Sequence, residues 1–205
     1  MDTYSRYIWD FFKSKIGNEY GVAGLMGNLE AESGLCPYRL QGDFSSGYST
    51  SVTYTAQVDS GAISEYDFVH NGPGGGGYGL AQWTYYTRKQ ALYDRCKSGG
   101  YSSIGSIELA CDHLWHELQT EFSGVLSVLK TASSIREASD KVLHDFENPA
   151  EQGASVEAYR ASLGQTWYEK FTGTGGGPVE PGGPGQVKKH KMSLLLMYMA
   201  TRRRL

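Results

Sequence analysis

The sequence predicts a mainly helical α+β domain, followed by a linker and a short tail. Segments with apolar residues at helical spacing recur through the first 146 residues, most clearly at 107–122. Alternating apolar residues at 51–58 indicate a short hairpin. From residue 173 the composition shifts to glycine and proline, which cannot form a core. We therefore expect a domain over residues 1–172, a linker over 173–187 and a basic, apolar tail over 188–205.

Helices are expected wherever apolar residues repeat at intervals of three and four. The first should begin after an N-cap at Asp2 or Thr3, and the helix near residue 134 should be capped by Ser133 or Ser134. The expected helices cover residues 3–15, 19–32, 85–97, 107–122, 122–129 and 134–146. The stretch from 35 to 77 is rich in Gly, Ser, Thr and Tyr, and it is expected to be a loop apart from the hairpin.

The second expected helix carries a carboxylic acid on its apolar face, which is formed by Val22, Leu25, Met26 and Leu29. Glu32 follows Leu25 by seven residues, and a helix drifts only about 20° per heptad, so its carboxyl group projects from that face. Burial there would raise the pKa of the carboxyl group, as a general acid requires. Glu30 should be solvated, and Ser33 and Gly34 should end the helix. This stretch alone also allows a surface glutamate on a frayed last turn.

Composition and charge exclude several classes of protein. A net charge of −3 provides no broad basic surface, so nucleic acid is not an expected partner. The cysteines Cys36, Cys96 and Cys111 cannot all pair internally and match no zinc module, so reduced thiols are expected, with one bridge left open. The N-terminal segment lacks the pattern of a Sec signal peptide.

Two further patterns suggest metal or phosphate chemistry but lack the required spacing. The sequence H-L-W-H-E at 113–117 has neither the zincin order nor the inverted order, so surface or packing roles are expected and no metal site is assigned. The glycine run at 72–77 lacks the Lys-Ser or Lys-Thr of a phosphate loop and is expected to be a connector. No G-x-S-x-G motif is present, and no cofactor is expected.

Two motifs together indicate a family. E-S-G-L-C-P at 32–37 is followed, after a variable loop, by G-Y-G-L-A-Q-W-T at 77–84. This order resembles the lysozyme superfamily that includes goose-type lysozymes and soluble lytic transglycosylases. With G-N-L-E-A-E-S-G upstream and Q-W-T downstream, the chain is most similar to the phage-tail lysozyme domain. The resemblance spans about residues 4–171 and includes F-E-N-P at 146–149, after which a last helix packs back.

The resemblance implies a lysozyme-like helical domain with a small hairpin or loop region beside a cleft. Glu32 is then the catalytic acid, and the substrate is the β-1,4 bond between N-acetylmuramic acid and N-acetylglucosamine in peptidoglycan. A second carboxylate that holds water is sought in the loop, where the candidates are Asp59, Glu65 and Asp67. Candidate substrate-binding residues are Ser33, Tyr78, Gly79, Gln82 and Trp83. Gly79 would allow close approach of a sugar, Gln82 would bind an N-acetyl group, and the two aromatic rings would stack on sugars or fill the core.

Alternatives remain for the reaction. Hydrolysis is favoured over lytic transglycosylation, which gives 1,6-anhydro products, because the loop carries three carboxylates. A non-catalytic virion or wall protein that binds glycan is the alternative from another class. Without a Sec signal, the protein is expected in the virion tail or released from the host cytoplasm. The tail at 188–205 is too short for a membrane span of about 20 residues. Two alternatives stay open for it: docking on phage tail proteins or on a membrane surface, or a solvated tail with little structure.

Overall fold

The computed structural model describes residues 2–70 and 76–173, and helices form nearly all of the regular structure there. The helices are α1 (Asp2–Ile16), α2 (Glu19–Ser33), α3 (Ser49–Asp59), α4 (Glu65–His70), α5 (Tyr86–Ser98), α6 (Ile107–Gln119), α7 (Ser123–Thr131), α8 (Ile135–Val142) and α9 (Ala154–Thr172), with a 3-10 turn η1 (Ser46–Tyr48) and a π-helical turn η3 (Leu143–Glu147). The mainly helical prediction is confirmed.

The predicted hairpin at 51–58 is wrong, because these residues lie in α3. The buried residues of this helix are Ser51, Tyr54, Thr55 and Val58, which recur at intervals of three and four. The apolar residues of the same stretch also alternate, as in a strand, and the prediction was based on this alternation. Among the described residues, pairing of the β type is limited to two isolated antiparallel bridges, Leu40 with Tyr78 and Tyr78 with Trp83.

Helix α2 is the centre of the molecule, and it begins and ends at capping residues that the sequence specifies. The Asn18 side chain accepts a hydrogen bond from the Tyr20 backbone and donates one to the Ala132 carbonyl oxygen. Gly34 ends the helix in the left-handed region, with φ of 66°, and its N–H bonds to the Glu30 carbonyl oxygen. The predicted stop at Ser33 and Gly34 is therefore confirmed.

Glycines allow three helices to approach the backbone of α2 closely. A methyl group added at Gly21, Gly24 or Gly27 would lie within 3 Å of α7, α8 or α9 respectively. At Gly27 the nearest atom would be the Arg160 carbonyl oxygen, at 2.3 Å. Helix α2 is consequently buried on nearly all sides and not along one apolar face.

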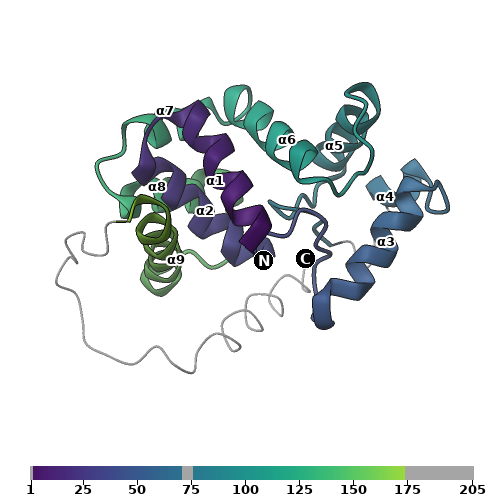
Figure 1. Ribbon diagram of the computed structural model, residues 1–205, viewed down its shortest axis with the longest axis horizontal. Helices are drawn as coiled ribbons and strands as arrows, with labels where there is room; N and C mark the ends of the chain where they lie inside the picture. The colour runs from purple at the N-terminus through teal and green to yellow at the C-terminus, as the bar shows by residue number, and fades with distance from the viewer. Residues whose placement is uncertain (1, 71–75, 174–205) are drawn as a thin grey trace.

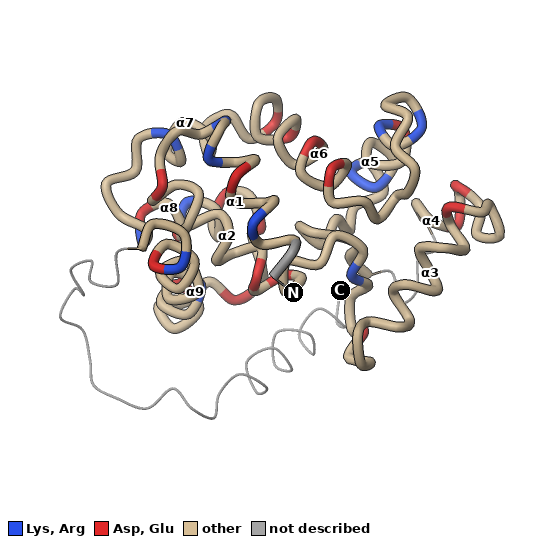
Figure 2. The backbone as a smooth tube through the Cα atoms, in the orientation of Figure 1, with Lys and Arg blue, Asp and Glu red and all other residues tan. Residues whose placement is uncertain are grey.

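Figure 1 shows two parts of the fold. Helices α1, α7, α8 and α9 surround α2, while α3 and α4 stand apart from it on the other side of the molecule. Helices α5 and α6 pack against each other and lie between these two groups, at the top of the view in Figure 1. Basic residues gather on α5 and acidic residues on α6 (Figure 2). Arg88 and Arg95 of α5 form ion pairs with Glu117 and Asp112 of α6, at 2.6 Å and 2.7 Å, which join the two helices.

The expected linker and tail lie almost entirely beyond the described residues. The structure follows the chain to residue 173, so the boundary at 172 and the roles of segments 173–187 and 188–205 stay predictions. Within the described ranges, no helix combines the length and apolarity needed to cross a membrane.

The glycine contacts predict the effect of two alanine substitutions on the free energy of unfolding. Gly27→Ala should lower it by about 1–3 kcal/mol, because the added methyl group meets the backbone of α9. Gly124→Ala is the matched control: it lies in α7 with nothing within 4 Å of an added methyl group, and should raise stability by up to about 1 kcal/mol. Urea unfolding measures both changes, and equal effects at the two positions would contradict the packing described here.

Candidate functional site

Glu32 lies in the last turn of α2 and is buried, with 6% of its surface exposed. The burial that the sequence predicts for this carboxyl group is therefore present. Its neighbour Ser33 is also buried and donates a hydrogen bond from Oγ to the Leu29 carbonyl oxygen at 3.0 Å. Ser33 thus supports the end of the helix, and its hydroxyl hydrogen is directed into the protein.

An arginine of α9 forms an ion pair with Glu32. Arg160 Nη2 lies 2.6 Å from Glu32 Oε1, and both side chains are buried. Arg160 Nη1 donates to Asn28 Oδ1 at 3.0 Å, and Asn28 Nδ2 donates in turn to the backbone oxygen and hydroxyl of Ser139 in α8. A continuous chain of buried polar contacts therefore links α8, α2 and α9 to Glu32.

Two features of the structure bear on the proposed role of Glu32: its carboxyl group is buried, and the guanidinium of Arg160 lies beside it. Sequence reasoning considered only burial, because Arg160 lies 128 residues away and belongs to neither motif. The expected protonation of Glu32 therefore stays a prediction.

The expectation that Glu30 is solvated is wrong in part. The residue is half-buried, and its Oε2 accepts a hydrogen bond of 2.8 Å from Trp167 Nε1 of α9. Both glutamates near the end of α2 are therefore held by α9. They differ in partner, because Glu30 faces an indole and Glu32 faces a cation.

The aromatic residues of the second motif lie inside the protein. Tyr78 is 2% exposed, and its hydroxyl shares a hydrogen bond of 2.7 Å with Thr55. Trp83 is fully buried, and its Nε1 donates to Glu117 Oε2 at 2.8 Å. In this conformation neither ring presents a face on which a sugar can stack. Of the two roles expected for these rings, sugar stacking and core packing, the structure therefore favours core packing.

Gln82 and Gly79 hold the neighbouring segment of backbone. Gln82 Nε2 donates to the carbonyl oxygens of Arg39 and Gly79, each at 3.0 Å. The Gly79 N–H donates to the same Arg39 oxygen at 2.8 Å, and a methyl group at Gly79 would lie 3.1 Å from the Pro37 carbonyl oxygen. Gly79 therefore permits a close approach, but of the Trp83 ring and the Pro37 backbone, and Gln82 uses its amide to fix the segment after α2.

That segment brings Arg39 to the end of α2. Its Nη1 donates to the Tyr48 hydroxyl at 2.6 Å, and its guanidinium lies over the Tyr48 ring at 4.4 Å and the Phe44 ring at 5.9 Å. A methyl group at Gly34 would lie 3.7 Å from Arg39 Nη1. Arg39 is 7% exposed. Sequence reasoning missed this residue, whose only signal is a cation placed between the two motifs.

The three loop carboxylates proposed to hold water lie on the part of the molecule that stands apart from α2 (Figure 1). Asp59 accepts hydrogen bonds from Ser103 Oγ and the Ile104 N–H at 2.6 Å and 2.8 Å. Asp67 accepts from Ser64 Oγ, and Glu65 accepts from Gln90. Each carboxylate thus has a local structural partner, and none is brought next to Glu32.

A fourth carboxylate of the loop, Asp43, is buried and anchors the start of α3. It accepts hydrogen bonds from the backbone N–H and the hydroxyl of both Ser45 and Ser51, at 2.5–3.0 Å. Burial raises the pKa of the Asp43 carboxyl group, but the four hydrogen bonds outweigh it and lower the pKa to about 2. Asp43 is therefore ionised at neutral pH and is committed to the loop.

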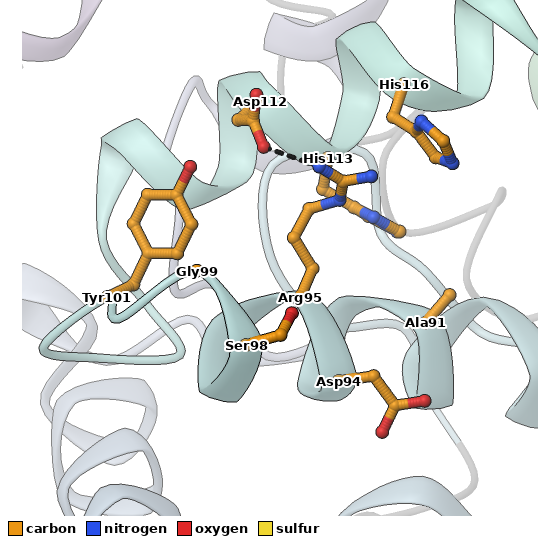
Figure 3. A pocket seen from close by; sticks show the side chains of 9 residues that line it. All are labelled: Ala91, Asp94, Arg95, Ser98, Gly99, Tyr101, Asp112, His113 and His116. Atoms are coloured by element: carbon orange, nitrogen blue, oxygen red, sulfur yellow. Dashed lines mark hydrogen bonds and ion pairs between the residues drawn. The ribbon is translucent and has the colours of Figure 1, made fainter.

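Two surface pockets lie away from Glu32. One, of about 440 Å³, is lined by residues of α5 and α6 with Gly99 and Tyr101, and Figure 3 shows Arg95 crossing it to Asp112 beside His113. The other, of about 480 Å³, lies between α1 and α6.

Burial lowers the pKa of His113 to about 4, so its ring is neutral at pH 7. Among the described residues, no group of His, Cys, Asp and Glu side chains is arranged to hold a metal ion.

The chain matches the family model described as phage tail lysozyme over residues 3–171, a span that runs from α1 to α9 and includes both motifs. The resemblance drawn from E-S-G-L-C-P and G-Y-G-L-A-Q-W-T is thereby confirmed. A comparison with curated proteins gave no match.

The ion pair predicts a coupled effect on stability. Glu32→Gln and Arg160→Met should each lower the free energy of unfolding by about 3 kcal/mol or more, because each leaves a buried polar partner without its counter-charge. The double variant should be less destabilised than the sum by about 1–3 kcal/mol. Urea unfolding of all four proteins measures this coupling, and effects that add within about 0.5 kcal/mol would show that the pair does not form.

Asp43 predicts a stability effect that depends on pH. Asp43→Asn should lower the free energy of unfolding by about 1–3 kcal/mol at pH 7, since the ionised acceptor is lost. The folded pKa of about 2 lies below the ordinary value of about 3.9, so this stabilisation is present above pH 4 and is lost as the pH falls toward 2. Unfolding measured from pH 2 to 7 tests it, and a difference that stays constant over this range would contradict the assignment.

Proposed function

The chain belongs to the phage tail lysozyme family, and from this premise we propose that it cleaves the β-1,4 bond between N-acetylmuramic acid and N-acetylglucosamine in peptidoglycan. Glu32 is the general acid in this proposal. The setting is the tail of a phage particle that opens the bacterial wall, which fits the family description. The C-terminal tail is then a candidate contact with other tail proteins.

The placement of Glu32 carries the proposal. Its carboxyl group is the functional group at the end of the central helix, and it is buried and oriented by Arg160. Glycosidic bond cleavage needs a carboxylic acid that donates a proton to the leaving oxygen as the bond breaks. In this arrangement α2 and α9 hold the carboxyl group rigidly, so little orientational entropy is lost when substrate binds. The group must carry a proton at that step.

The second step separates two reactions. Hydrolysis requires a water molecule on the reactive carbon, held by a carboxylate or another strong acceptor. Lytic transglycosylation uses the 6-hydroxyl of the sugar and needs no such group. The positions of Asp59, Glu65 and Asp67, each hydrogen-bonded in the part of the fold away from α2, favour transglycosylation as the second candidate. We keep hydrolysis as the first candidate because the family is described as a lysozyme, and hydrolysis is the reaction typical of lysozymes.

The proposal predicts that Glu32→Gln abolishes clearing of a purified wall suspension, because the proton donor is lost. Glu30→Gln is the matched control, since it lies in the same turn and also contacts α9, and it should retain most of the activity. Circular dichroism must show that both variants are folded. Retention of more than a few per cent of activity by Glu32→Gln would exclude it as the acid, and clearing by neither the wild type nor Glu30→Gln would favour a glycan-binding role.

The masses of the digestion products distinguish the two reactions. Hydrolysis leaves reducing ends, whereas transglycosylation leaves 1,6-anhydro ends that are lighter by one water. We predict reducing products for the wild-type protein, as measured by mass spectrometry of digested walls. Anhydro-muropeptides as the main products would exclude hydrolysis and assign the enzyme to the transglycosylases.

A further inference from the structure

Arg39 is a buried cation whose Nη1 lies near Gly34, two residues after the proposed acid. The described residues provide no carboxylate within ion-pair distance of its guanidinium, although six pairs between an arginine and a carboxylate form elsewhere in the same part of the chain. Its protein contacts are the Tyr48 hydroxyl and the rings of Tyr48 and Phe44. Burying a cation without a counter-charge is costly, and such groups are rare outside functional sites.

The edge of this guanidinium that has no protein partner is suited to binding a carboxylate. Nη1 is occupied by Tyr48, whereas Nε is buried and has no hydrogen-bond partner among the described residues. No partner is found there for Nη2 either, and this atom is not buried. Nε and Nη2 share one edge of the planar group, which matches the two oxygens of a carboxylate. A carboxylate bound on this edge would supply both the missing charge and an acceptor for Nε.

The backbone around Arg39 is fixed by protein contacts. Gln82 and Gly79 both donate to its carbonyl oxygen, and its Nη1 lies close to Gly34, two residues after Glu32. Of its two aromatic neighbours, Phe44 is 56% exposed. The cation is therefore held on a rigid support at the end of α2, beside an exposed ring that can contact substrate.

We propose that Arg39 binds a carboxylate of the lactyl-peptide branch on the muramic acid residue next to the scissile bond. This inference rests on the proposed function, in which one sugar at the site carries that branch. The carboxylate is either the lactyl group itself, in strands without peptide, or an acidic group of the attached peptide. Arg39 then distinguishes muramic acid from N-acetylglucosamine, which lacks the branch.

The test compares glycan strands that differ in the group attached to the lactyl branch. Peptide-free strands with free lactyl carboxylates are compared with the same strands converted to neutral methylamides, and with strands that retain their peptides. The full chain should cleave the acidic strands with kcat/KM about tenfold or more above the methylamides. Arg39→Gln should remove this preference by slowing only the acidic strands, and Arg39→Lys should keep part of it. Arg95→Gln is the control, because Arg95 pairs with Asp112 away from the site.

The outcomes separate this inference from the proposed function. If wild-type protein cleaves the two peptide-free strands equally, and Arg39→Gln slows only the strands that retain their peptides, the carboxylate belongs to the peptide. Equal slowing on acidic and neutral strands by a folded Arg39→Gln protein would overturn the inference and make Arg39 a structural residue. If the wild-type protein cleaves no strand, the proposed function fails, and equilibrium binding of the same strands decides the inference alone. Binding that prefers the acidic strands only when Arg39 is present supports it, and equal binding overturns it.

Discussion

The ion pair between Glu32 and Arg160 is the interaction on which the arrangement of the site depends. Two buried charges are stable in a protein interior only when their geometry is good and their remaining hydrogen-bonding atoms are satisfied. Here Arg160 also bonds to Asn28, which is held by Ser139 of α8. The pair forms only if α9 approaches α2 closely, and that approach requires glycine at position 27. The ion pair at the end of α2 therefore depends on the close packing of α9 against α2.

The second motif serves this site indirectly. Its aromatic residues fill the core, where Tyr78 bonds to Thr55 and Trp83 bonds to Glu117. Its Gly79 and Gln82 hold the backbone of Arg39 beside the last turn of α2. From its sequence, this motif is expected to bind substrate. In this conformation it supports the segment that follows Glu32. The cation that it presents is the side chain we expect substrate to contact.

Much of the fold follows from local sequence, and the missed features depend on contacts between distant residues. The limits of α2 follow from Asn18, the apolar spacing and Gly34, all of which act within a few residues. The stretch at 51–58 satisfies both a strand period and a helix period, and packing of Tyr54 and Val58 decides for the helix. Burial of Glu32 could be read from its register on α2. Its partner Arg160 could not, because it lies 128 residues away, and Arg39 has no motif to mark it.

The most direct test of the central claim is a crystal structure of the Glu32→Gln protein with a bound peptidoglycan glycan fragment. If the end of α2 is the catalytic site, the glycosidic oxygen will lie within about 2.6–3.2 Å of the side chain at position 32. A fragment that instead occupies the pocket between α5 and α6, without contact to position 32 or to Arg39, would contradict the account.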